Sequence, residues 1–228
     1  MSFYNDYRPQ KFSEILGQDQ SLQILKKQAL TGAFHHSYLF YGASGSGKTS
    51  TARILAAAIN CPNLNGTGEP CGECPSCNAI RKSAHWDVIE LDGARYRGID
   101  DIRELAYKAQ FAPFGPGKKV FIVDEAHRIT DTAFDAMLKL LEEPPPHLVI
   151  ILCSTDQSKI PLTVKSRCQL YPFHSLKPND VKCKLESIVK RERREPDLQL
   201  KHLQFIVENA AGNMRSAETL LEQVLCLK

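Results

Sequence analysis

The sequence lacks any segment that resembles a secretory signal or a membrane span, and it carries little net charge. Its first residues, MSFYNDYRPQKF, contain no apolar stretch of the kind that a signal peptide needs. No apolar run approaches the roughly 18–20 residues that a membrane-spanning helix requires. The net charge of +3 does not by itself predict nucleic-acid binding. We therefore expect a cytoplasmic protein without a membrane partner, in which any DNA-binding surface is a local patch.

The absence of a visible secretory signal also bears on the eight cysteines, which are expected to be thiols or metal ligands before disulfides. The remaining composition is ordinary for a globular protein, because 43% of the residues are hydrophobic and 24% are charged. A chain of 228 residues can build one sizeable core and a small second unit.

One stretch matches a nucleotide-binding motif together with its flanks. The apolar run Tyr38–Tyr41 predicts a buried strand, GASGSGKT at 42–49 fits G-x-x-x-x-G-K-[ST], and a helical pattern follows at once. In such a loop, backbone N–H groups and the helix dipole surround phosphate oxygens. Lys48 can reach the β- and γ-phosphates, and the Thr49 hydroxyl can hold Mg²⁺. The expected nucleotide-binding residues here are Gly42, Ala43, Ser44, Gly45, Ser46, Gly47, Lys48, Thr49 and Ser50.

Four of the cysteines fall in one stretch between residues 60 and 78, which is rich in Pro, Gly and Asn and has no apolar period. We expect this stretch to be a loop without a core of its own. Cys61 is followed by Cys71, Cys74 and Cys77, which form C-x-x-C-x-x-C. Four thiolates suit a tetrahedral Zn²⁺ ion. An iron–sulfur cluster is the alternative, although such runs usually continue to a further Cys followed by Pro. We expect a structural zinc module at about residues 61–77.

Two other expected strands end in polar side chains. The strand Lys118–Glu125 has four consecutive apolar residues before Asp124 and Glu125, and the strand Leu148–Cys153 is followed closely by Thr155. Parallel α/β sheets bind their ligands at the carboxyl ends of the strands. Asp124 can therefore bind Mg²⁺, Glu125 can polarise a water for attack on the γ-phosphate, and a hydroxyl such as that of Thr155 can orient this water.

The alternation of strands and helices between residues 37 and 173 predicts an α/β fold with a five-stranded parallel sheet flanked by helices. The strand around residues 86–92 begins at Trp86, which we expect to serve in the core or in packing rather than as a platform for a ligand. After residue 178 the pattern changes to three helical stretches, with breaks at Pro196 and Gly212. We therefore expect a nucleotide-binding domain at residues 1–176 and a small three-helix lid domain at residues 177–228.

Taken in chain order, these features resemble an AAA+ ATPase, a P-loop NTPase core followed by a helical lid. The sequence is similar in particular to the bacterial clamp-loader motor subunits, DNA polymerase III gamma/tau. This resemblance covers essentially the whole chain. It rests on Tyr7-Arg8-Pro9 with Phe12 and Gly17-Gln18, on the four-cysteine insert, on the run Leu140–Pro145, and on Ser166-Arg167-Cys168.

The resemblance implies a motor that works in an oligomeric ring and uses ATP, Mg²⁺ and Zn²⁺. ATP binding would open a sliding clamp on primed DNA, and hydrolysis would release it, during chromosome replication by the DNA polymerase III holoenzyme. The implied partners are delta, delta prime and further gamma/tau subunits, together with the sliding clamp and primed DNA. Gamma/tau chains normally continue into a helical collar, which we expect to be absent because this sequence stops at Lys228.

The resemblance also assigns roles to single residues. Arg167 would be an arginine finger that stabilises the γ-phosphoryl transition state in the neighbouring subunit. Thr155 would be the first sensor, and Arg215 would be the second sensor, touching the phosphates of its own subunit. Tyr7 and Arg8 would contribute to nucleotide binding from the N-terminal arm.

Three alternatives remain open. The chain could be a delta-prime-like loader subunit, although such chains typically have a damaged phosphate loop and this one is intact. Asp124–His127 spells DEAH, which suggests a helicase, but the residues after Lys177 are too few and too helical for a second motor domain. A zinc-dependent DNA-binding module is the third, and it would leave Glu125 and Arg167 without a purpose.

Overall fold

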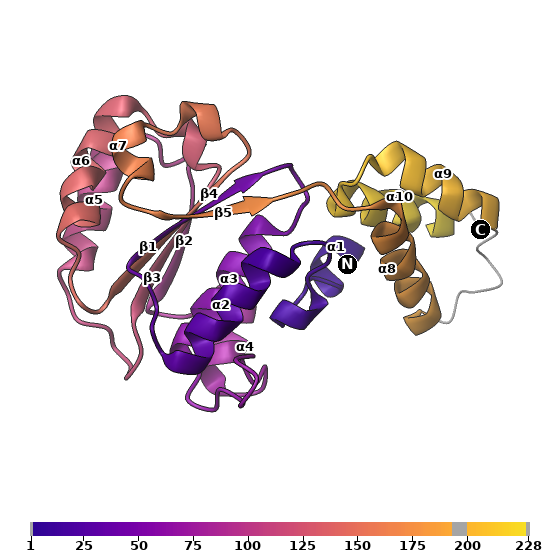
Figure 1. Cartoon of the computed structure of the whole chain (residues 1–228), viewed down its shortest axis with the longest axis horizontal. Coiled ribbons are helices and arrows are strands. Elements are labelled where there is room, and N and C mark those ends of the chain that lie inside the picture. The colour runs from indigo at the N-terminus through magenta and orange to yellow at the C-terminus, as the bar shows by residue number, and fades with distance from the viewer. Residues whose placement is uncertain (1, 193–199, 227–228) are drawn as a thin grey trace.

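The computed structural model of the protein describes residues 2–192 and 200–226. Its centre is a five-stranded parallel sheet with helices on both faces, and a separate group of helices lies at one end of the molecule (Figure 1). The strands are β1 (Ser37–Gly42), β2 (Val88–Asp92), β3 (Lys119–Asp124), β4 (Leu148–Ser154) and β5 (Gln169–Phe173).

The strands lie in the order β2-β3-β4-β1-β5, and each neighbouring pair is parallel. Tyr41 of β1 pairs with Ser154 of β4, and Gly42 pairs with Phe173 of β5. The segments after β1, β3 and β4 therefore leave the sheet at the same edge. The expected five-stranded parallel sheet is confirmed.

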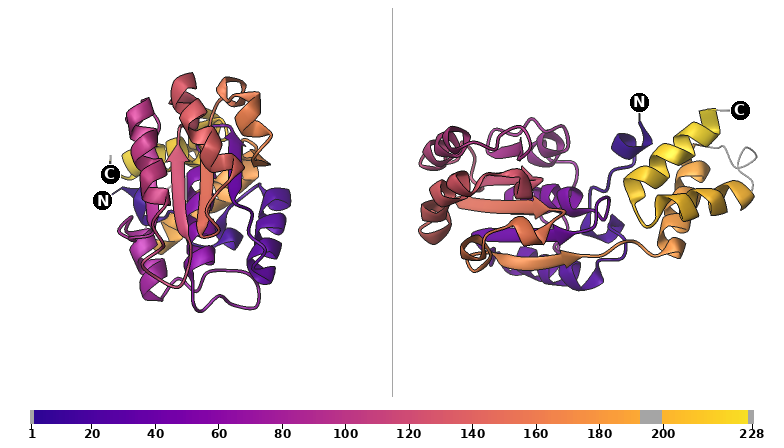
Figure 2. Two further views of the ribbon diagram at one scale, coloured as in Figure 1. Left: turned by 90° about the vertical axis from the view of Figure 1, so that its left-hand side faces the viewer. Right: turned by 90° about the horizontal axis from the view of Figure 1, so that it is seen from above.

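Helices cover the two faces of the sheet, and α7 (Leu162–Lys165) leads into β5 (Figures 1 and 2). Successive side chains of a strand point to opposite faces, so Tyr38 and Phe40 pack on one side and Leu39 packs on the other. One face is covered by α2 (Asp19–Thr31) and α3 (Lys48–Asn60), and the other by α5 (Ile99–Ala109) and α6 (Asp131–Glu142). Double coverage explains why the central strands read as unbroken apolar runs.

Local sequence signals set several of the helix ends. Gly32 ends α2 in the left-handed conformation at φ 66°. The Asp101 carboxylate accepts a hydrogen bond from the Gly98 N–H at 3.0 Å and so caps the start of α5. The proline run after Glu143 prevents α6 from continuing. Short elements connect the larger ones: α1 (Phe3–Asp6), η1 (Phe12–Glu14), η2 (Ala126–Arg128) and η3 (Gln157–Lys159).

The cysteine-bearing insert was expected to be a loop throughout, but it ends in the helix α4 (Pro75–Arg81). Pro75 favours the first helical position, and the Cys74 sulfur accepts a hydrogen bond from the Cys77 N–H at 3.3 Å. Trp86 was expected in the core or in packing. It is 81% exposed and therefore outside the core, but its ring packs beside Phe114, with 6.0 Å between ring centroids. The strand was expected to begin at Trp86, but β2 begins only at Val88, so Trp86 lies before the strand.

In the described residues after β5, three helices follow the sheet: α8 (Pro178–Arg191), α9 (Leu200–Ala210) and α10 (Met214–Cys226). They share an apolar cluster that is separate from the clusters on the sheet and includes Val181, Leu185, Ile206 and Leu221. The expected break at Pro196 lies outside the described residues. In the described part of the chain, no helix is both long enough and apolar enough to span a membrane.

Substitution of Gly42 tests how closely the backbones of β1 and β5 approach each other at the end of β1. Its φ is 135°, and a Cβ at this position would lie 1.9 Å from the carbonyl oxygen of Phe173. Gly42→Ala should lower the free energy of unfolding by about 2–4 kcal/mol, because β1 and β5 must separate to admit the methyl group. Gly66→Ala is the matched control, since a Cβ there meets nothing within 4 Å. Urea unfolding curves measure both changes, and equal effects would contradict the prediction.

Candidate functional site

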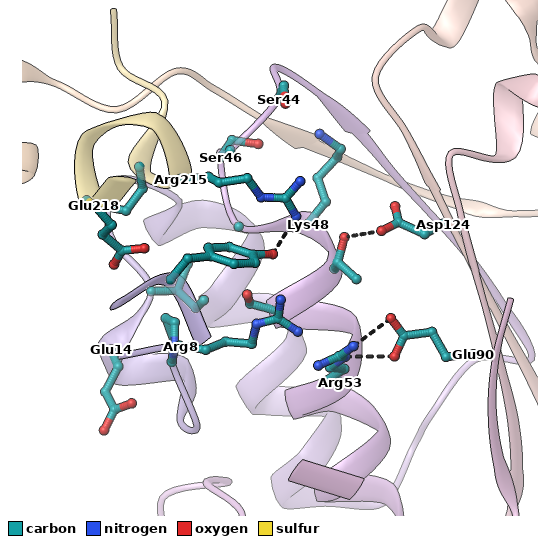
Figure 3. A pocket seen from close by; sticks show the side chains of 18 of the residues that line it. Arg8, Glu14, Ser44, Ser46, Lys48, Arg53, Glu90, Asp124, Arg215 and Glu218 are labelled. Atoms are coloured by element: carbon teal, nitrogen blue, oxygen red, sulfur yellow. Dashed lines mark hydrogen bonds and ion pairs between the residues drawn. The ribbon is translucent and has the colours of Figure 1, made fainter. Parts of the chain in front are cut away.

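A cavity of about 560 Å³ opens at the carboxyl edge of the sheet. Its walls come from the loop between β1 and α3, the ends of β2 and β3, the N-terminal arm (residues 2–16) and the start of α10. Figure 3 shows side chains from these separate elements, among them Lys48, Asp124, Arg8 and Arg215, around one space. Residues that lie far apart in the sequence therefore form a single site.

The loop Gly42–Thr49 has the compact form expected of a phosphate loop. The Ser46 hydroxyl donates to the Ala43 carbonyl at 2.6 Å and closes the turn. A Cβ on Gly45, whose φ is 68°, would lie 1.9 Å from Oδ1 of Asn213. The Met214 N–H donates to the Gly45 carbonyl at 3.2 Å. The first residue of α10 therefore sits directly on the loop.

Lys48 is the first residue of α3 and is 6% exposed. Its ammonium donates to the carbonyls of Gly42 at 2.8 Å and Ala43 at 2.7 Å. Burial lowers the pKa of this ammonium, and the nearby Asp124 and Glu125 partly oppose the change. The loop thus holds a desolvated cation next to the cavity.

Thr49 and Asp124, the two residues predicted to hold Mg²⁺, are brought together. The Thr49 hydroxyl donates to Oδ2 of Asp124 at 2.8 Å, which joins the start of α3 to the end of β3. A hydroxyl and a carboxylate at the rim of a phosphate loop are the oxygen donors that Mg²⁺ takes in nucleotide sites. The donor set therefore fits the ion that a bound nucleotide would bring.

Glu125 follows β3 in the left-handed conformation, with φ 49°. Its Oε2 accepts a hydrogen bond from the Thr155 hydroxyl at 3.1 Å and lies 3.3 Å from Nε2 of His127. A strained backbone of this kind persists only where the surroundings fix it, and it is common at functional sites. The pairing of Glu125 with Thr155 places both predicted residues at the same edge of the cavity.

Arg215 and Arg8 lie on the same aromatic ring, that of Tyr4. The Arg215 guanidinium is 4.3 Å from the ring centroid and also donates to the Tyr4 hydroxyl, and the Arg8 guanidinium is 4.6 Å from the same centroid. Tyr7 is not part of the cavity wall. Its ring packs on Phe3, and its hydroxyl donates to Glu192. Partial burial and this contact raise the pKa of Tyr7 to about 12.

Among the residues of the cavity wall that were not singled out from the sequence are Tyr4, Arg53, Glu90 and Glu218. Arg53 donates to both carboxylate oxygens of Glu90, each at 2.7 Å (Figure 3). Glu218 is 3% exposed, and burial raises its pKa to about 7. No local signal identifies these residues, because each depends on partners that only the fold brings near.

Arg167 lies away from the cavity and follows α7. Its guanidinium donates to the Thr163 carbonyl at 2.7 Å and pairs with Glu142. Arg167 and Glu142 border a different hollow, which is also lined by His35 and His36. The fold therefore does not bring Arg167 to Lys48 within one chain.

The sulfur atoms of Cys61, Cys71, Cys74 and Cys77 all lie within 4.8 Å of one another. The Cys61–Cys74 pair is 4.0 Å apart and the Cys71–Cys77 pair is 3.9 Å apart. Tetrahedral coordination with Zn–S bonds of about 2.3 Å places sulfurs about 3.8 Å apart. The N–H groups of Cys74 and Cys77 donate to the sulfurs of Cys71 and Cys74 at 3.3 Å. The cluster is compatible with a tetrahedral metal ion.

Comparison with known proteins gives relatives over nearly the whole chain. The DNA polymerase III subunit tau of Bacillus subtilis is 40% identical over 224 residues, which is 98% of this chain and 39% of that protein. Subunit gamma/tau of Mycobacterium tuberculosis is 40% identical over 227 residues, and subunit tau of Escherichia coli is 38% identical over 221. The chain thus spans 39% of the length of the first two relatives and 34% of the third. The resemblance to gamma/tau subunits is confirmed.

Solved structures show the same fold. The Thermotoga maritima RuvB Holliday junction branch migration motor superposes with a TM-score of 0.69 at 16% identity, covering 96% of this chain and 65% of that one. A family model described as DNA polymerase III, delta subunit, matches residues 17–177. This match includes the phosphate loop, the carboxylates at the end of β3 and the cysteine cluster, and it covers more than half of the chain. The chain therefore belongs to the DNA polymerase III, delta subunit, family.

Proposed function

We propose that the chain is an ATP-hydrolysing motor subunit of a bacterial clamp loader. ATP binding would open a sliding clamp on primed DNA, and hydrolysis would release it, within the DNA polymerase III holoenzyme. One observation carries the ATPase part of this proposal: Lys48, the Thr49–Asp124 pair and the Glu125–Thr155 pair meet at one cavity. The gamma/tau names of the relatives support the place in replication.

In this proposal the nucleotide phosphates lie in the loop Gly42–Ser50, at the N-terminus of α3. Backbone N–H groups and the helix dipole bind the phosphate charge. The Lys48 ammonium, now held by two loop carbonyls, exchanges them for phosphate oxygens at little cost because it is already desolvated. Arg8 and Arg215 add positive charge from the arm and from α10.

Thr49 and Asp124 would hold Mg²⁺, which neutralises charge on the phosphates. Glu125 would orient and polarise the attacking water. Thr155 holds one oxygen of Glu125 and leaves the other for that water. In the described residues, the proposed machinery belongs to one P-loop unit, and α8–α10 follow it.

We assign residues 1–176 to the AAA+ nucleotide-binding domain and residues 177–228 to a three-helix lid. The contact between Met214 and Gly45 supports a lid that senses the loop. Arg167, remote from its own cavity, would act as an arginine finger in the site of a neighbouring loader subunit. Cys61, Cys71, Cys74 and Cys77 would hold a structural Zn²⁺ ion in the insert.

Two variants separate nucleotide binding from hydrolysis. Lys48→Ala should weaken ATP binding on the order of 100-fold, because a buried charge that pairs with phosphate is lost. Glu125→Gln should retain ATP affinity and lower kcat by about 10²–10⁴-fold, because the group that polarises water is lost. Equilibrium dialysis and phosphate release measure the two effects, with the exposed Glu143→Gln as control. Loss of ATP binding in Glu125→Gln would contradict the assigned roles.

Arg167→Ala tests action between subunits. ATP affinity of the isolated chain should stay within about twofold, whereas ATPase of the complex assembled with clamp-loader partners should fall on the order of 10³-fold or more. Lys165→Ala, at the end of the short helix α7 that precedes Arg167, is the matched control. An Arg167→Ala chain that binds no ATP as a monomer would refute the trans role.

Metal analysis tests the cysteine cluster. The purified chain should hold one equivalent of zinc and no inorganic sulfide, and Co²⁺ substitution should give the absorption of a tetrahedral thiolate site. Cys77→Ser should weaken metal affinity on the order of 100-fold, since one of four ligands is lost. Cys183→Ser, an exposed thiol on α8, is the control and should leave affinity unchanged. If the analysis found stoichiometric iron and sulfide instead, the cysteines would hold an iron–sulfur cluster and not zinc.

A further inference from the structure

The insert between α3 and α4 contains a buried carboxylate that neither nucleotide binding nor metal binding explains. Glu69 is 5% exposed, and it lies two residues before Cys71 in the sequence. A carboxylate this deeply buried is costly unless charged and polar partners compensate it. Its partners therefore show what the residue does.

All three partners of the Glu69 carboxylate lie outside the insert. Oε2 accepts the Phe12 N–H at 2.7 Å, and Oε1 accepts the Ser13 N–H at 3.0 Å. These are amides of η1, in the N-terminal arm. Oε1 also pairs with the Lys26 ammonium of α2 at 2.7 Å. The Glu69 side chain thus binds the N-terminal arm through two charge-assisted hydrogen bonds, which are stronger than hydrogen bonds between neutral groups.

The backbone around Glu69 is itself fixed. Oδ1 of Asn65 accepts the Glu69 N–H at 3.0 Å and the Thr67 N–H at 3.1 Å. The Asn65 N–H donates to the Glu69 carbonyl at 3.3 Å. Gly68 passes so close to α2 that a Cβ would lie 2.5 Å from the Lys26 carbonyl oxygen. The turn 65–69 therefore presents the carboxylate in one direction, and it continues into the cysteine cluster.

The N-terminal arm lines the nucleotide cavity both before and after the two residues, Phe12 and Ser13, whose amides bind Glu69. Arg8 and Pro9 precede the two amides, and Ile15 and Leu16 follow them, and all four line the cavity. The Phe12 side chain is fully buried in the core beneath the arm. Release of the two amides would let this wall of the cavity move.

We infer that Glu69 is a positioning residue that couples the cysteine insert to the nucleotide cavity, by holding the arm through the amides of Phe12 and Ser13. This inference rests on the proposed ATP site. It gives the insert a role in nucleotide affinity: a metal ion that orders the cysteines also orders the turn that carries Glu69.

The test compares ATP affinity of the full chain with that of Glu69→Gln and Glu69→Ala. Glu69→Gln is nearly isosteric and keeps one acceptor oxygen, so it remains informative if Glu69→Ala does not fold. Glu73→Gln, an exposed glutamate between two of the cysteines, is the matched control. Glu69→Gln should raise the Kd for ATP about tenfold, as for an arm that is docked roughly one-tenth of the time. Glu73→Gln should stay within about twofold.

A second measurement separates positioning from general stability. Hydrogen exchange should accelerate at the Phe12 and Ser13 amides in Glu69→Gln, while the amides of β1 and β4 stay protected. Zinc removal from the wild type should raise the Kd for ATP by a similar factor. In Glu69→Gln, zinc removal should raise the Kd little further, because the contact between residue 69 and the two amides of the arm is already weakened.

The outcomes are distinct. A Glu69→Gln chain with faster exchange at Phe12 and Ser13 but an unchanged ATP Kd would overturn the inference and leave the ATPase proposal intact. Additive effects of zinc removal and Glu69→Gln would also overturn it. Failure of the wild type to bind ATP would instead overturn the proposed function.

Discussion

The parallel pairing of β1 with β4 and β5 is the constraint on which the site depends. Because the strands run in one direction, the phosphate loop after β1, the carboxylates at the end of β3 and the hydroxyl after β4 all lie at the same edge. Tyr38 and Phe40 pack against one helical layer and Leu39 packs against the other, so β1 cannot slip by one residue without exposing a buried face. The packing of the sheet core therefore fixes the relative positions of the site residues.

Those parts of the fold that depend on short-range signals could be predicted from the sequence. Unbroken apolar runs identified the central strands β1, β3 and β4, because strands that are covered on both faces of a sheet bury every side chain. Gly32 and the proline run after Glu143 marked helix ends through backbone sterics that act locally. The helix α4 was missed because its start depends on the Cys74 sulfur, which is an unusual cap. The exposure of Trp86 was missed because composition does not reveal where a strand begins to pair.

The residues of the candidate site also fall into two groups, those that local motifs predict and those that only the fold brings together. Lys48, Thr49, Asp124 and Glu125 are found from motifs whose spacing carries the chemistry. Tyr4 between two arginines, the Arg53–Glu90 pair and the anchoring of Phe12 by Glu69 each join residues that a single sequence does not relate. Such contacts form only after the chain has folded, so they mark the limit of inference from local pattern.

The hydrogen bond from the Met214 N–H to the Gly45 carbonyl has a wider thermodynamic meaning. It joins the backbone of the C-terminal helices to the turn in which phosphate charge would be received, without any side chain that a substitution could remove. The coupling between two elements joined in this way is reciprocal. If a bound nucleotide stabilises one orientation of these helices, then fixing the helices in that orientation strengthens nucleotide binding by the same free energy. A neighbouring molecule that grips α8–α10 could thus set the affinity of a cavity that it never touches.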